Sequence, residues 1–128
     1  MKFRLYREFF RALANGTRFS IVQLLREKPH YVNAIAEELE IEQSRVSHNL
    51  ACLLNCGFVE WEWSGKKKVY RLNSDLLPIL GGIDKHLARF ASALNSCQVL
   101  EKESRLVGVV AKSRPVENAR EITSRRRK

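Results

Sequence analysis

The chain has 128 residues, the size of one domain, and 45% of them are hydrophobic, which is typical of a globular protein and not of a disordered one. It has no apolar stretch of the about 20 residues that a membrane span needs, and no hydrophobic leader near its start. The odd count of three cysteines argues against a disulfide framework. We therefore expect a cytoplasmic protein with no membrane association.

The net charge of +9 is unevenly distributed. Residues 104–128 hold eight basic and two acidic side chains, a net of +6, so residues 1–103 carry only +3. A basic chain favours nucleic acid or an acidic membrane surface as its partner. We expect a folded domain over residues 1–103, followed by a basic, disordered tail over residues 104–128 that adds DNA affinity without sequence preference.

Four helices are predicted in the first half of the chain, where apolar residues recur every three or four positions. Their expected ranges are 3–14, 17–27, 32–39 and 43–55. Asn15-Gly16 breaks the first helix, and Thr17 is the expected cap of the second. The third and fourth helices are only three residues apart, as in a helix-turn-helix, and Gly57 is expected to close the fourth.

A hairpin is predicted next, because the period of the pattern changes. Residues 59–63 alternate between apolar side chains and glutamates, Ser64-Gly65 is a turn signal, and residues 66–72 form the returning strand. Three consecutive lysines lie at the predicted tip. The hairpin therefore presents positive charge at its far end.

A long last helix is predicted after Ser74, its expected cap. Its apolar residues recur with alternating spacings of four and three, which is the heptad pattern of paired helices. They are Leu76, Leu80, Ile83, Leu87, Phe90, Leu94 and Cys97. Such a stripe must be covered, and the same helix of a second chain is the natural cover.

The order of elements predicts a mainly α fold with a two-stranded β-hairpin wing, a winged helix-turn-helix that dimerises through its N- and C-terminal helices. Four segments then resemble the ArsR/SmtB family of metalloregulators, in the family's order and over about residues 3–100. They are Phe10 to Arg18, Gln43 to Leu50, Gly57 to Val59 and Val69 to Leu72. The resemblance implies a homodimeric repressor that leaves operator DNA when a metal ion binds.

The sequence departs from the family pattern in the turn and on the third helix. Glu40 stands where the family usually has glycine, and Glu42 stands where it has a Ser or Thr cap. A carboxylate in the first turn still suits the helix dipole. The third helix also lacks the Cys-x-Cys metal site that is frequent in the family.

Cys52 and Cys56 are four residues apart on the predicted fourth helix, so their sulfurs share one face, about 100° from the core direction. Packing under the wing or last helix is the structural alternative. With Cys97, the spacing resembles the cadmium/lead-sensing (CmtR-type) branch of the family. That resemblance implies that Cys52, Cys56 and Cys97 are the metal ligands, and thiolates suit Cd, Pb, Hg, trivalent As or Zn. A weaker, incomplete site is Asp84 with His86, which resembles half of another zinc site of the family.

DNA contacts are expected from the N-terminal turns of the fourth helix and from the wing tip. The candidates are Gln43, Ser44, Arg45, Ser47, His48, Lys66, Lys67, Lys68 and Arg71.

The function that we predict is a homodimeric repressor that binds double-stranded operator DNA in its apo form and is released by a thiophilic ion, with no organic cofactor. No catalytic motif is found, so we expect no enzyme. One alternative is a redox or reactive-sulfur sensing repressor on the same scaffold. The other is a constitutive DNA-binding protein whose cysteines are structural.

Overall fold

The computed structural model describes residues 2–106, which fall into two compact units on either side of the boundary between Leu77 and Pro78. The elements in chain order are α1 (Lys2–Ala14), α2 (Gly16–Glu27), β1 (His30–Tyr31), α3 (Val32–Leu39), α4 (Gln43–Asn55), β2 (Val59–Ser64), β3 (Lys67–Leu72), α5 (Leu76–Asn95) and α6 (Gln98–Leu106). The expected helix-turn-helix, wing and long helix are confirmed. No helix among the described residues is long and apolar enough to cross a membrane.

The core of the first unit lies among α2, α3 and α4. Its side chains with almost no exposure include Ile21, Val22, Ile35, Val46, Leu50 and Leu53. They come from the apolar stripes that predicted these helices, and burying each contributes about 1.5–3 kcal/mol. Phe58, Val59, Tyr70 and Leu72 extend this core under the base of the wing.

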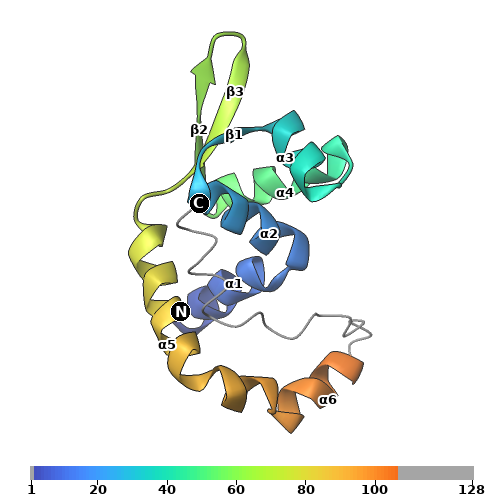
Figure 1. Ribbon diagram of the computed structural model, residues 1–128, viewed down its shortest axis with the longest axis vertical. Coiled ribbons are helices and arrows are strands. Elements are labelled where there is room, and N and C mark those ends of the chain that lie inside the picture. The colour runs from blue at the N-terminus through green and yellow to red at the C-terminus, as the bar shows by residue number, and fades with distance from the viewer. Residues whose placement is uncertain (1, 107–128) are drawn as a thin grey trace. The chain divides into compact units, whose positions relative to one another are not determined.

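The wing belongs to a three-stranded antiparallel sheet of order β1-β3-β2. Figure 1 shows β2 and β3 extending beyond the helices as a long hairpin, with β1 beside the base of β3. The short strand β1 is not foreseen from the sequence, because two residues carry no alternating pattern. It pairs His30 with Tyr70 and Tyr31 with Val69, which anchors the hairpin to the chain before α3.

The ends of two helices differ in how well the sequence predicts them. The prediction that Thr17 caps α2 is wrong. The helix begins at Gly16, and its cap is Asn15, whose side chain accepts a hydrogen bond from the Arg18 backbone N–H at 3.0 Å. The expected role of Gly57 is confirmed. It has a φ of 77°, and the N–H groups that follow α4 return to the carbonyls of Leu53 and Leu54.

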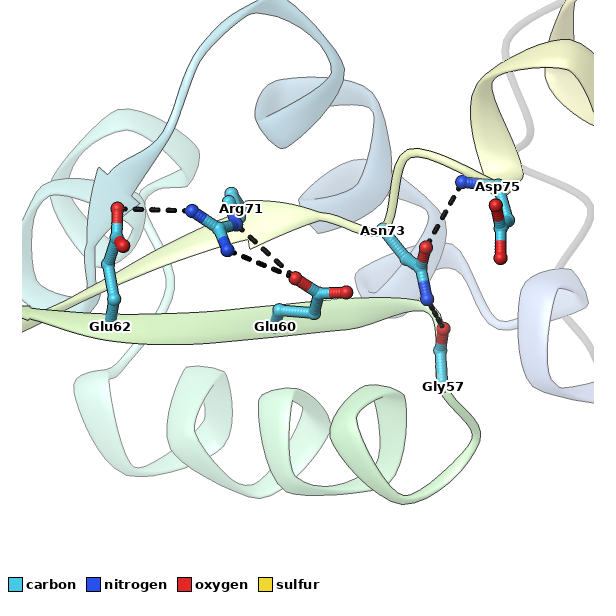
Figure 2. Close-up of polar contacts among 6 residues, drawn as sticks. All are labelled: Gly57, Glu60, Glu62, Arg71, Asn73 and Asp75. Atoms are coloured by element: carbon cyan, nitrogen blue, oxygen red, sulfur yellow. Dashed lines mark hydrogen bonds and ion pairs between the residues drawn. The ribbon is translucent and has the colours of Figure 1, made fainter.

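Asn73 closes the base of the hairpin, as Figure 2 shows. Its Nδ2 donates to the Gly57 carbonyl at 3.0 Å, and its Oδ1 accepts from the Asp75 backbone N–H at 3.0 Å. Asn73, the residue after β3, is thereby tied to Gly57, two residues before β2, so the direction of the wing is defined relative to the end of α4.

In the second unit, the predicted continuous stripe is interrupted. Helix α5 ends at Asn95, and Cys97 lies in the connection before α6, so the expectation that Cys97 continues the helical seam is wrong. At this break the Ser96 hydroxyl and backbone N–H both donate to the Ser92 carbonyl, at 2.6 Å and 3.1 Å, and the Cys97 N–H donates three residues back, to the Leu94 carbonyl, which tightens the last turn of the helix. Helix α6 continues past residue 103, where we expected the tail to begin, and residues 107–128 lie outside the described residues.

Glu40, between α3 and α4, is the one non-glycine residue with positive φ in the described chain, at 54°. Its side chain makes this left-handed conformation costly. Replacing Glu40 with Gly should therefore raise the free energy of unfolding by about 0.5–1 kcal/mol, measured by chemical denaturation. Glu40→Gln is the matched control, because it removes the charge and keeps the side chain. Equal stabilisation by both variants would assign the gain to charge and not to backbone conformation.

Candidate nucleic-acid interface and thiol site

Helix α4 presents a polar face to solvent at its N-terminal end. The predicted contact residues Gln43, Ser44, Arg45, Ser47 and His48 are all exposed, whereas Val46 among them and Leu50 just after them are buried. The 3.6-residue period separates these two sets because the core holds only one stripe of the helix. The exposed side chains offer hydroxyl, amide and imidazole groups, the hydrogen-bonding chemistry that reads base edges and phosphates.

A second face of α4 is bound to the first two helices by a network that the sequence analysis missed. Asn49 is only 6% exposed, although its position lies off the predicted core stripe. It accepts a hydrogen bond from Arg18 Nη1 at 3.3 Å and donates to the Arg45 carbonyl at 2.9 Å. Arg18 Nε also donates to the Ala12 carbonyl at 2.7 Å. Arg18 therefore joins α1, α2 and α4.

Arg45 extends this network at the surface, since its Nη2 donates to the Thr17 hydroxyl at 3.0 Å. The contact orients the guanidinium beside the start of α2. The sequence signal for this arrangement is weak, because Arg18 is one of several charged residues on α2 and nothing local indicates that it has a partner inside the fold. Arg45 remains exposed, so it stays a candidate for a phosphate contact.

The wing places its basic residues in two different environments. Lys66, Lys67 and Lys68 are exposed at the tip, as predicted. Arg71 is exposed but engaged, because its guanidinium lies 3.2 Å from a Glu60 carboxylate oxygen and 3.1 Å from one of Glu62 (Figure 2). A phosphate would have to compete with two carboxylates for Arg71.

Two thiols lie together at the C-terminal end of α4, with Cys52 in its last turn and Cys56 directly after Asn55. Cys52 is half-buried and Cys56 is exposed, and both are free. Partial desolvation of the thiol, followed by the charge and hydrogen bonding of Cys52, raises the pKa of Cys56 above its ordinary value of 9.0. Arg18 opposes this rise in the pKa, and Glu8 of α1 adds to it. The two sulfurs therefore interact directly and face the α1–α2 region.

The other candidate ligands lie in the second unit. Cys97 is free and half-buried in the connection between α5 and α6. Asp84 and His86 lie on α5, where the His86 ring contacts Phe90 with centroids 4.7 Å apart. Within the described range 2–106, no three His, Cys, Asp or Glu side chains are grouped as a metal site. Cys52 and Cys56 are thus the part of the predicted ligand set that the structure brings together.

Comparison with known proteins adds sequence and structural relatives. Residues 15–60 match the family described as "Bacterial regulatory protein, arsR family". The chain is 36% identical over 90 residues to a probable mercury resistance operon repressor of Streptomyces lividans, an alignment that covers 70% of this chain and 72% of that protein. Further curated relatives are matched over 48% to 58% of their own length.

Two solved structures share the fold. One is the cadmium metal-sensor CmtR of Mycobacterium tuberculosis, with a TM-score of 0.51 and 36% identity over 58% of this chain and 78% of that one. The other is a homodimeric winged helix-turn-helix DNA-binding domain of Mycobacterium bovis, with a TM-score of 0.59 and 28% identity over 69% of this chain and 82% of that one. They confirm the winged helix-turn-helix fold class.

Proposed function

This chain belongs to the arsR family of bacterial regulatory proteins, and on that premise we propose that it is a homodimeric repressor whose operator binding is relieved by a thiophilic metal ion. The family comprises transcriptional regulators and not enzymes, so the chain is a DNA-binding regulator. To this family role the proposal adds a metal ion as the effector, the residues that bind it, and a homodimer as the DNA-binding form. Its main support is the pair of interacting thiols on the helix that presents the DNA-contact residues.

The proposed DNA contacts are the exposed side chains of α4 and the wing lysines. Gln43, Ser44, Ser47 and His48 meet base edges or phosphates, and Arg45 with the lysines at the tip meets phosphate. Arg71 contributes less than its charge suggests, because its ion pairs with Glu60 and Glu62 must loosen first. The partner that we propose is double-stranded operator DNA.

The proposed effector ligands are Cys52 and Cys56, with Cys97 of either protomer as the third thiolate. Adjacent thiols fit a soft ion such as Cd, Pb, Hg, trivalent As or Zn, and they do not fit hard ions such as Mg. Relatives described as mercury-resistance and cadmium-sensing proteins support this class of effector. The incomplete pair Asp84 and His86 remains the weaker candidate site.

The coupling between metal and DNA follows from the position of the thiols. Occupation of Cys52 and Cys56 acts on α4 itself, one turn from Asn49, whose hydrogen bond to Arg18 joins α4 to the first two helices. If the occupied arrangement fits DNA poorly, metal and DNA oppose each other by linkage, by about 1–3 kcal/mol, or roughly 5–150-fold in affinity.

The direct experiment measures DNA affinity by fluorescence anisotropy with and without Cd, Pb, Hg, Zn or arsenite. The probe is a labelled duplex that the apo protein selects from a random-sequence pool. We expect one or more soft ions to weaken binding by roughly 5–150-fold, and Mg to have no such effect. Tight binding that no soft ion weakens would leave a constitutive DNA-binding protein as the better description.

Metal binding should depend on pH in a direction set by Cys56. Its raised pKa keeps the thiol protonated at neutral pH, so an ion must displace the proton. Apparent metal affinity should therefore rise with pH, by about tenfold per unit for each proton released, as long as the pH stays below that pKa. Titrations between pH 6 and about 8 that follow thiolate absorbance and proton release measure this slope. A flat profile would mean that Cys56 is not a ligand.

The raised pKa of Cys56 makes this thiol a poor candidate for the redox-sensor alternative. Oxidants react with the thiolate, and sensor cysteines usually have a lowered pKa. The pKa of Cys56 is shifted in the opposite direction, because partial burial disfavours its thiolate and the neighbouring Cys52 and Glu8 repel a negative charge on its sulfur. A soft cation relieves this arrangement by neutralising the developing charge, which favours a metal effector over an oxidant.

A further inference from the structure

The two faces of the wing differ in chemistry. Side chains alternate between faces along a strand, and directly paired residues share a face. Trp63 is paired with Lys68 and Trp61 with Tyr70, whereas Glu60 is paired with Arg71. One face is therefore aromatic and cationic, and the other holds the carboxylates.

The aromatic face, defined here as Trp61, Trp63 and Lys68, is preorganised. The two indole rings meet edge to face with centroids 5.3 Å apart. The Lys68 ammonium lies 4.3 Å from the Trp61 ring centroid and 5.8 Å from that of Trp63. This cation–π arrangement holds the lysine in place. Trp63 nevertheless remains 62% exposed, which is unusual for so large an apolar side chain.

The two faces differ in how far their charges are neutralised by ion pairs. Lys68 makes no ion pair with any described residue, so its charge is available to a partner. On the opposite face, Glu60 and Glu62 lie 3.2 Å and 3.1 Å from Arg71, and with Lys67 on the same face the charged side chains carry no net charge. A polyanion is therefore attracted more strongly to the first face, whose positive charge no neighbouring carboxylate neutralises, than to the second.

We propose that the wing lays its aromatic face against the sugar–phosphate backbone of duplex DNA. Trp63 packs its ring on deoxyribose, and its indole N–H and the Lys68 ammonium donate hydrogen bonds to phosphate oxygens. This inference rests on the proposed DNA-binding function and adds which face of the wing meets DNA. The charge complementarity of Lys68 and the adjacent Lys66 selects DNA over an apolar protein surface.

Intrinsic fluorescence tests the contact, because the chain has only two tryptophans and both lie on this face. Trp61→Phe leaves Trp63 as the sole reporter. Acrylamide quenching of this variant is measured free and bound to a duplex selected from a random-sequence pool, with binding followed separately by anisotropy of the labelled DNA. We expect the quenching constant to fall by at least about twofold in the complex, because packed DNA excludes the quencher. A complex in which Trp63 is quenched as in the free protein overturns the inference.

Two adjacent lysines on opposite faces provide a matched pair of variants. Lys68 lies on the aromatic face, whereas the Lys67 ammonium lies 5.7 Å from the centroid of the Tyr31 ring on the other face. Lys68→Ala should reduce the slope of log affinity against log salt by about one, and Lys67→Ala should change it much less. An equal or larger loss in Lys67→Ala would reverse the orientation. Failure of the wild-type chain to bind any duplex would instead remove the proposed function, so the two failures are distinguishable.

Discussion

Replacing both thiols of α4, Cys52→Ser together with Cys56→Ser, should abolish metal-induced release of DNA. Serine keeps the size of the side chain but removes the soft ligand, so the roughly 5–150-fold weakening by Cd, Pb or Hg should disappear. Apo-protein affinity for DNA should stay within about twofold, because neither side chain belongs to the core. The measurement is anisotropy of a labelled duplex titrated with protein, with and without the metal.

A matched control is Asn55→Ser, which changes an exposed residue of the same helical turn and removes no sulfur. It should respond to metal like the unmodified chain. Cys97→Ser should also abolish release if that thiolate is a ligand, and should change only stability if Cys97 merely packs. Release that persists in the double variant would refute the thiol site and make Asp84 and His86 the leading candidates.

Placing charges on the exposed apolar part of α5 should convert the protein into a monomer. Phe90 and Leu94 are 43% and 46% exposed, and α1 exposes Phe3, Tyr6 and Phe10. These exposed apolar residues of α1 and α5 support our proposal that a second copy covers them. Phe90→Asp with Leu94→Asp should therefore prevent association, because burying unpaired carboxylates in an interface is costly.

The expected loss in DNA affinity is large, about 100- to 10,000-fold, because a monomer engages one half-site where a dimer engages two. Sedimentation analysis gives the mass, and circular dichroism shows whether the fold persists. Ala88→Asp with Ser92→Asp is the matched control, since it adds the same charges at exposed positions on another face of α5. A double variant at Phe90 and Leu94 that stays dimeric and binds DNA normally would place the interface elsewhere.

The N-terminal helices and the wing show how far local patterns reach. Helices α3 and α4 have the predicted ranges, and α1 and α2 begin within one residue of them, because their apolar periodicity is strong and turn residues bound them. The cap of α2 was misassigned because Asn15 and Thr17 are both good capping residues, and only the hydrogen bond from the Arg18 N–H to Asn15 distinguishes them. Likewise, nothing local in His30–Tyr31 indicates a strand, since its partner lies 40 residues away in β3.

In the candidate site, too, local sequence patterns predict some features, and contacts between distant residues decide the others. Sequence alone determined that this is a winged helix-turn-helix protein and that Cys52 and Cys56 share a helical face. It also determined which side chains near the start of α4 face solvent, namely Gln43, Ser44, Arg45, Ser47 and His48. These features follow from helical period and spacing within one element. Only the tertiary structure decided that Asn49 is buried against Arg18 and that Arg71 is held by Glu60 and Glu62. Those environments depend on which distant residues another element or strand register brings into contact, and no local pattern encodes that choice.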